Sequence, residues 1–203
     1  KHTYMNRHLP KIQCLLSSCF ITAPGMRLLA YIKNDMLGEK AEDQIIKRMI
    51  TGWQNMTILD VGSGPCRKQK DRRFRKANFT CFDMSKPYLE ACLGLGFKTV
   101  CGDACKINKY FHFKSFDIVW LIDIIEHMKK KDGLKLIDRV EKIAKKQILI
   151  STPLGWYPLD HECVNESWGA DINENINKKN RYQQHVSSWY PRDFEQYGYE
   201  CEV

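Results

Sequence analysis

The chain has 203 residues, of which 43% are hydrophobic and 28% charged, and its formal net charge is +8 at pH 7. This length suits one domain with a sizeable core, and the composition is that of a globular protein rather than a disordered one. No apolar run approaches the roughly 18–20 residues needed to cross a bilayer, so we expect no membrane span. The cysteines, interpreted as thiols in a reducing compartment, predict a cytoplasmic location.

We expect residues 1–203 to form a single domain. Residues 1–53 precede the predicted sheet and are expected to be a helical N-terminal extension, which could serve as a lid. Within it the sequence predicts a helix over 37–53, because Ile45, Ile46, Met49 and Ile50 lie on one helical face.

Residues 57–66 run from an apolar stretch into Asp60 and a turn that contains Gly62 and Gly64. The apolar start predicts a buried parallel strand, and the glycines allow a ligand to approach the backbone closely. Asp60 places a carboxylate at the end of that strand, where open α/β sheets bind ligands. A dinucleotide fingerprint needs a third glycine where this chain has Arg67, and Asp60 would repel a pyrophosphate. The turn therefore favours a cofactor with an amine and a sulfonium and no phosphate, such as S-adenosylmethionine.

After this turn, short apolar runs alternate with polar, helix-prone runs, which predicts βαβ units and a parallel sheet. The sequence predicts an α/β fold with a doubly wound, mostly parallel sheet of six to seven strands in three α/β/α layers. The last predicted strand ends with the chain, and a seven-stranded sheet would need one more, so we expect the C-terminus to be truncated or abbreviated. The further predicted strands are 79–83, 98–101, 116–122, 147–151 and 199–203, and the predicted helices are 86–95, 132–145 and 191–197.

Three more acidic residues lie at the ends of predicted strands. Asp83 lies about 20 residues beyond the glycine turn and can accept hydrogen bonds from both ribose hydroxyls of a nucleoside. Asp103 can accept from an adenine amino group, and Met84 can pack on the adenine face. Asp123 lies near the expected methyl-transfer end. A single acid at a strand end is commonly a helix cap, but four at successive strand ends are hard to obtain by chance.

Residues 57–151 resemble the core of the class I S-adenosylmethionine-dependent methyltransferases, which have a Rossmann-like fold. The first family motif matches Asp-x-Gly-x-Gly at 60–64, and Asp-Ile-Ile-Glu-His-Met at 123–128 is similar to the Asp-x-x-Glu-His-Leu segment of type-11-like members. Many members have a glycine where this chain has Cys66. The resemblance implies that S-adenosylmethionine is bound by Asp60, Gly62, Ser63, Gly64, Asp83, Met84, Asp103, Ala104, Ile122 and Asp123.

Residues 152–190 are predicted to form an insertion on the substrate side, because a structureless loop of this length is uncommon unless it has a function. The segment resembles a group of uncharacterised methyltransferases with a Thr-Pro-x-Gly loop and a His-x-Ser-x-Trp element. His127 and then His185 are candidate general bases, although a structural role for His127 is an equal alternative. The candidate substrate contacts are Trp156, Tyr157, His161 and Trp189, which could instead anchor the loop.

None of the nine cysteines forms a Cys-x-x-Cys pair. Cys101 and Cys105 lack a second pair or a nearby histidine, so we expect no metal and interpret the cysteines as ordinary buried thiols. Seven of the ten residues 67–76 are basic, and 129–131 form a second basic cluster. Such patches can attract nucleic acid, but without interleaved aromatic residues a solvated helix face is the simpler interpretation.

Together these features predict a methyltransferase that acts on a small-molecule or glycan-like acceptor, with O-methylation as the expected reaction. Two alternatives stay open. The basic residues would suit an RNA methyltransferase, and Cys66 with the missing strand would suit a methyltransferase-like protein that binds without catalysis.

Overall fold

The computed structural model describes residues 25–33, 54–66, 69, 77–157 and 181–203. These residues form one seven-stranded sheet in the order β4-β3-β2-β5-β6-β1-β7, and its strand pairings are parallel. The strands are β1 Arg27–Lys33, β2 Thr57–Val61, β3 Asn78–Asp83, β4 Lys98–Cys101, β5 Phe116–Ile122, β6 Ala144–Pro153 and β7 Glu200–Glu202. The helices are α2 Lys86–Gly94, α3 Lys130–Ile143 and α6 Arg192–Glu195, with 3-10 turns η2 Ala104–Lys109, η3 Ile125–His127 and η4 Arg181–Gln183.

The predicted α/β class and the seven-stranded parallel sheet are confirmed. The bounds of β4 and β5 are those expected from the sequence, and β2, β3, β6, β7 and the helices α2, α3 and α6 differ from prediction by at most three residues at either end. The predicted helix over 37–53 and residues 158–180 of the predicted insertion lie outside the described residues.

The N-terminal region differs from prediction. Residues Arg27–Lys33 form strand β1 inside the sheet, between β6 and β7, rather than part of a helical extension. The seventh strand of the described sheet is therefore β1, which comes from the N-terminal segment. Five consecutive buried residues, Leu28 to Ile32, have the continuous apolar pattern of a strand that is covered on both faces.

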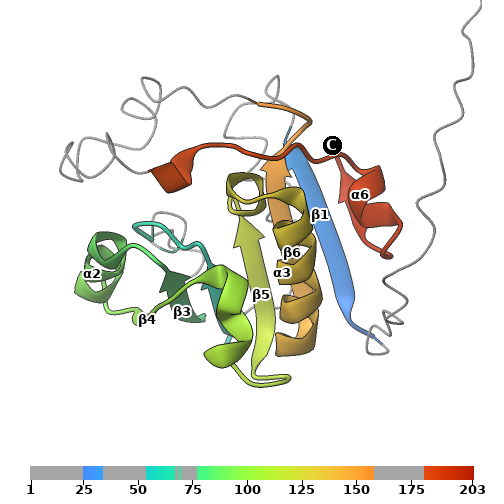
Figure 1. The fold of residues 1–203 in the computed structure, drawn as a ribbon. Coiled ribbons are helices and arrows are strands. Elements are labelled where there is room, and N and C mark those ends of the chain that lie inside the picture. The colour runs from blue at the N-terminus through green and yellow to red at the C-terminus, as the bar shows by residue number, and fades with distance from the viewer. Residues whose placement is uncertain (1–24, 34–53, 67–68, 70–76, 158–180) are drawn as a thin grey trace, which may run out of the picture.

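Successive side chains along each strand point to opposite faces of the sheet. Both faces carry buried apolar residues, and helices cover both of them. In β5, Val119 and Leu121 belong to the core on the α3 side. Ile118 and Trp120 belong to the opposite core, which includes residues of α2. Figure 1 shows α3 lying along β5 and β6, and α2 beside β3 and β4. This is the predicted three-layer arrangement.

The C-terminal segment docks against α3. Trp189 and Phe194 stack with ring centroids 5.4 Å apart, and both side chains are completely buried. The Tyr199 hydroxyl donates a hydrogen bond to Glu141 Oε1 at 3.0 Å. Burial raises the pKa of Glu141, and the Tyr199 bond partly offsets this rise. These contacts fix the chain after residue 181 on the sheet. None of the helices among the described residues is long and apolar enough to cross a membrane.

Candidate active site

The glycine turn after β2 has a backbone that only glycine adopts without strain. Gly62 has φ +73°, and its N–H donates to the carbonyl oxygen of Phe82 at 2.7 Å. A Cβ at this position would lie 2.7 Å from Ile124 Cδ1, so no larger residue fits. Gly64 also has a positive φ, +53°, but nothing lies within 4 Å of a Cβ placed there. The turn therefore has no room for a side chain at Gly62, whereas there is open space beside Gly64.

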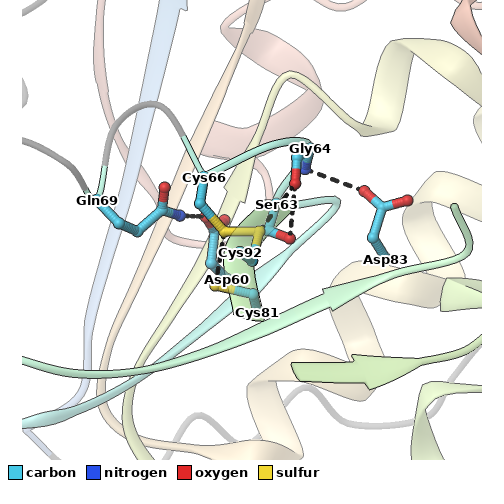
Figure 2. Close-up of a disulfide and its surroundings, with 8 residues drawn as sticks. All are labelled: Asp60, Ser63, Gly64, Cys66, Gln69, Cys81, Asp83 and Cys92. Carbon is cyan, nitrogen blue, oxygen red and sulfur yellow. Dashed lines mark hydrogen bonds between the residues drawn. A yellow bond between two sulfur atoms is a disulfide. The ribbon is translucent and has the colours of Figure 1, made fainter. Parts of the chain in front are cut away.

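Asp83 joins the end of β3 to this turn. The backbone N–H of Gly64 donates to Asp83 Oδ2 at 3.0 Å, and that of Ser85 donates to Oδ1 at 2.8 Å. Figure 2 shows the Asp83 carboxylate reaching toward Gly64. Burial raises the pKa of Asp83, while the bonds from Ser85 and Gly64 lower it. The structure therefore brings together two of the residues that the sequence assigned to the cofactor.

Cys66 stands where many family members have glycine, and its φ is +59°. Its sulfur forms a disulfide with Cys92 of α2, with the two Cα atoms 5.4 Å apart (Figure 2). The sulfur of Cys81 lies 3.1 Å from that of Cys66. The prediction of ordinary thiols is wrong for Cys66 and Cys92, because the fold brings residues 26 positions apart into bonding distance.

Asp60 lies near the end of β2, just before the turn. It is 5% exposed, and its Oδ2 accepts a hydrogen bond from Gln69 Nε2. Burial and the nearby Asp60 carboxylate raise the pKa of Cys81 to about 12. Ser63 Oγ donates to the carbonyl oxygen of Gly64 at 3.4 Å within the turn, and its backbone N–H donates to the carbonyl oxygen of Phe82 in β3 at 3.3 Å. Roles for Asp60 and Ser63 in holding methionine stay predictions.

The predicted adenine-binding residues follow β3 and β4. Asp103 caps η2, because its Oδ1 accepts from the backbone N–H of Cys105 at 2.8 Å. Its Oδ2 lies 3.5 Å from Lys106 Nζ. Met84 is 46% exposed, and Ala104 opens η2. These contacts assign Asp103 the capping role that the sequence left open, and the adenine assignment stays a prediction.

Asp123 follows β5 in a left-handed conformation, with φ +53°. Its Oδ2 forms an ion pair with Lys33 Nζ at 2.7 Å. The sequence analysis did not identify Lys33 as a site residue. The apolar run at 28–32 was the signal that could have placed Lys33 at the end of a strand. Ile122, the last residue of β5, is 6% exposed. Lys33 and Asp123 thus lie at the same edge of the sheet, where β1 and β5 end.

His127 and His185 come together although 58 residues separate them in the chain. Their ring centroids lie 4.8 Å apart, with an angle of 66° between the planes. His127 Nδ1 lies 3.2 Å from the carbonyl oxygen of Gln184, and His185 Nδ1 lies 2.7 Å from that of Tyr157. Burial and the neighbouring His185 lower the pKa of His127 to about 4. The pKa of His127 therefore lies below that of an ordinary imidazole.

Glu126 is a site residue that the sequence did not single out beyond its place in the family segment. It is 2% exposed, and Thr152 Oγ1 donates to its Oε2 at 3.1 Å. Burial and the nearby Asp123 carboxylate raise the pKa of Glu126. His127 is its neighbour in the sequence, but only the fold reveals that His185 lies beside both of them.

The predicted substrate contacts divide into exposed and buried residues. Trp156 is 58% exposed and Tyr157 40% exposed. The prediction is wrong for Trp189, which is completely buried and donates its Nε1–H to Ser187 Oγ at 2.9 Å. Trp189 instead anchors its segment, as the alternative interpretation allowed. His161 lies outside the described residues.

Residues 59–149 match the family model Methyltransf_11, which describes a methyltransferase domain. No curated protein sequence matches the chain. The described fold is similar to three solved structures at TM-scores of 0.53–0.54. The first is an S-adenosylmethionine-dependent methyltransferase from Archaeoglobus fulgidus, 18% identical, with coverage of 78% of this chain and 66% of that protein.

The second is a protein from Pyrococcus horikoshii, 15% identical, with coverage of 81% of this chain and 82% of that one. The third is a Haemonchus contortus phosphoethanolamine N-methyltransferase in complex with phosphomonomethylethanolamine and S-adenosylhomocysteine. It is 21% identical, with coverage of 79% of this chain and 37% of that one. The chain thus spans about two thirds of the Archaeoglobus protein and about a third of the Haemonchus one. At these identities the likeness concerns the fold. Residues 59–149 thus match a methyltransferase domain, and the parallel sheet and the turn after β2 resemble the fold of the class I S-adenosylmethionine-dependent methyltransferases.

Proposed function

We propose that this protein transfers the methyl group of S-adenosylmethionine to a hydroxyl oxygen of a small-molecule or glycan-like acceptor. One observation carries the proposal. The open glycine turn, Asp83 and His127 follow the carboxyl ends of the neighbouring parallel strands β2, β3 and β5, and His185 packs against His127. Open α/β sheets bind their ligands at this edge.

The cofactor half of the site fits S-adenosylmethionine. Gly64 leaves open space above the turn, which allows the cofactor to approach the backbone. Each oxygen of Asp83 already accepts one backbone N–H and has a further lone pair for a ribose hydroxyl. Bound S-adenosylmethionine supplies a methyl group that is already activated on a sulfonium, so the protein mainly aligns the acceptor.

The acceptor half offers groups that can orient a hydroxyl and take its proton. His127 and His185 both have lowered pKa values, chiefly because of burial, and are neutral at neutral pH. A neutral imidazole with one N–H bonded to a carbonyl has a lone pair on its other nitrogen, which can accept the hydroxyl proton. The exposed rings of Trp156 and Tyr157 offer flat surfaces for an acceptor.

The first test is calorimetry with S-adenosylhomocysteine on the unchanged protein and on Asp83→Asn. A charged acceptor of hydrogen bonds is worth about 1.5–3 kcal/mol. We therefore expect the dissociation constant to rise by about ten- to a hundredfold. Asp138→Asn, on the surface of α3, is the matched control and should bind as the unchanged protein does. No binding to the unchanged protein would support the non-catalytic alternative.

The second test follows methyl transfer from labelled S-adenosylmethionine to a panel of hydroxyl acceptors. His127→Ala should lower turnover more than it lowers cofactor affinity, because the histidine acts on the acceptor. Unchanged rates would remove His127 from the list of catalytic residues. Methylation of RNA instead of the panel, with an affinity that falls steeply with salt, would favour the RNA alternative.

A further inference from the structure

We propose that Glu126, His127 and His185 bind a divalent first-row transition-metal ion, and that this ion holds the acceptor hydroxyl. The first half of this proposal stands on the described side chains alone. The second half rests on the proposed function, and in it the ion would take the histidine lone pairs and would itself acidify the acceptor hydroxyl, whose proton would pass to solvent.

The three side chains converge on one point. One carboxylate oxygen of Glu126 and one ring nitrogen from each histidine all lie within 4.8 Å of one another. Ligands bound to one zinc-like ion at about 2.1 Å lie about 3.4 Å apart in tetrahedral geometry. Small rotations of the side chains therefore close the set around an ion.

Both histidines are oriented as metal ligands usually are. Each Nδ1 faces a backbone carbonyl, that of Gln184 for His127 and that of Tyr157 for His185. A carbonyl oxygen only accepts hydrogen bonds, so each Nδ1 donates, and the lone pair of the neutral ring is on Nε2. Such a bond fixes the tautomer and the ring direction of metal-binding histidines and strengthens the ligand.

The backbone holds the ligands in place before any ion arrives. The N–H groups of Val186 and Ser187 donate to the carbonyl oxygen of Glu126 at 2.8 and 3.2 Å. Ser187 Oγ donates to the carbonyl oxygen of Ile125 at 3.2 Å. The segment with His185 is thus tied directly to η3, which contains the other two ligands. Preorganisation of this kind is what a binding site requires.

The local charge also favours a cation. Asp123 and Glu126 both lie at this edge, and Lys33 forms an ion pair with Asp123 at 2.7 Å. Glu126 adds a second carboxylate, which is 2% exposed and accepts from the neutral Thr152 hydroxyl. A divalent cation would give this buried carboxyl group a charged partner in addition to the Thr152 hydroxyl.

The chemistry of the ligand set selects the class of ion. Imidazole and carboxylate ligands suit zinc, manganese, iron, cobalt and nickel, and three protein ligands leave open positions for a substrate oxygen. A second cluster, Cys66, Cys81 and Cys92, also has its sulfur atoms within 4.8 Å of one another. Two of those sulfurs are joined in a disulfide, so that cluster lacks the free thiolates that a soft metal needs.

The test is a titration of the chelator-treated protein with Co²⁺, followed by visible absorption. We expect ligand-field bands that saturate at one equivalent. Glu126→Gln keeps the side-chain shape, and His185→Gln keeps a polar group at that position. Each should weaken Co²⁺ binding at least about tenfold. His112→Ala, an exposed histidine outside the site, is the matched control and should bind Co²⁺ unchanged.

The outcomes separate this proposal from the proposed function. S-adenosylhomocysteine binding is measured on the same variants and should persist, which shows that each variant is folded. A near-ultraviolet sulfur-to-cobalt band, no binding, or binding that Glu126→Gln and His185→Gln leave unchanged would each overturn the metal site. Methyl transfer by the metal-free protein at the rate seen with Co²⁺ would overturn the role in holding the acceptor, while the proposed function would stand.

Discussion

The two halves of the site are built in different ways. The cofactor half, Asp60 to Asp103, comes from one continuous stretch and has a covalent link between Cys66 and Cys92. The acceptor half gathers Lys33, Glu126, Thr152 and His185 from distant parts of the chain and is held by hydrogen bonds and packing. The cofactor half should therefore tolerate a loss of packing around α3, whereas the acceptor half should depend on the docking of the C-terminal segment.

Trp189→Ala tests that dependence and should have the largest effect. The indole is completely buried, stacks on Phe194 and packs against Gly133. Truncation of a buried tryptophan costs about 3–5 kcal/mol. We expect a loss of this size in the free energy of unfolding, measured with denaturant. The control Trp156→Ala removes an exposed ring and should stay within about 0.5 kcal/mol.

The same variant separates the two halves at temperatures where it remains folded. Because Trp189 lies two residues after Ser187, which bonds to η3, the variant should lose methyl transfer before it loses affinity for S-adenosylhomocysteine. An equal loss of both would show that the halves are not independent.

The difference between the halves also decides what could be predicted from the sequence. The turn after β2, its glycines and the acids at strand ends depend on local patterns, and the structure places them as expected. The position of β1 depends on its pairing with β6, which no local pattern encodes. The burial of Trp189 depends on the small residue Gly133, 56 positions earlier, where a Cβ would lie 2.7 Å from the indole. The partner of Cys66 could not be read from cysteine spacing either.

The disulfide should give the next largest effect. In a chain-entropy estimate, a cross-link over 26 residues stabilises the folded state by about 3.5 kcal/mol. Because Cys81 lies 3.1 Å from Cys66 and offers an alternative bridge, the reference protein carries Cys81→Ser. Adding Cys92→Ser to it should lower the free energy of unfolding by about 3.5 kcal/mol.

Reductant provides the control for this effect. It should destabilise the Cys81→Ser protein and leave the double variant unchanged, whereas Cys101→Ser, at an exposed free cysteine, should respond to reductant as the unchanged protein does. If reductant has no effect on the Cys81→Ser protein, the covalent link does not stabilise the cofactor half, and the two halves differ only in sequence continuity.

Alanine substitutions at three glycines with positive φ, Gly62, Gly64 and Gly96, should have the smallest effects on stability. They also give the sharpest test of the cofactor half. Alanine in a left-handed conformation costs about 1–2 kcal/mol. Gly64→Ala and Gly96→Ala should each lose only this amount, because nothing lies within 4 Å of a Cβ at either position. Gly62→Ala should lose more, because its Cβ would lie 2.7 Å from Ile124 Cδ1.

Affinity for S-adenosylhomocysteine then distinguishes the two glycines with open surroundings. Gly96 follows α2, away from the turn, so Gly96→Ala should bind as the unchanged protein does. Gly64→Ala places a methyl group in the space that we assign to the cofactor and should bind more weakly at equal stability. Equal affinities for Gly64→Ala and Gly96→Ala would mean that the cofactor does not approach the backbone at Gly64, and Asp83 would then be the main contact of the cofactor half.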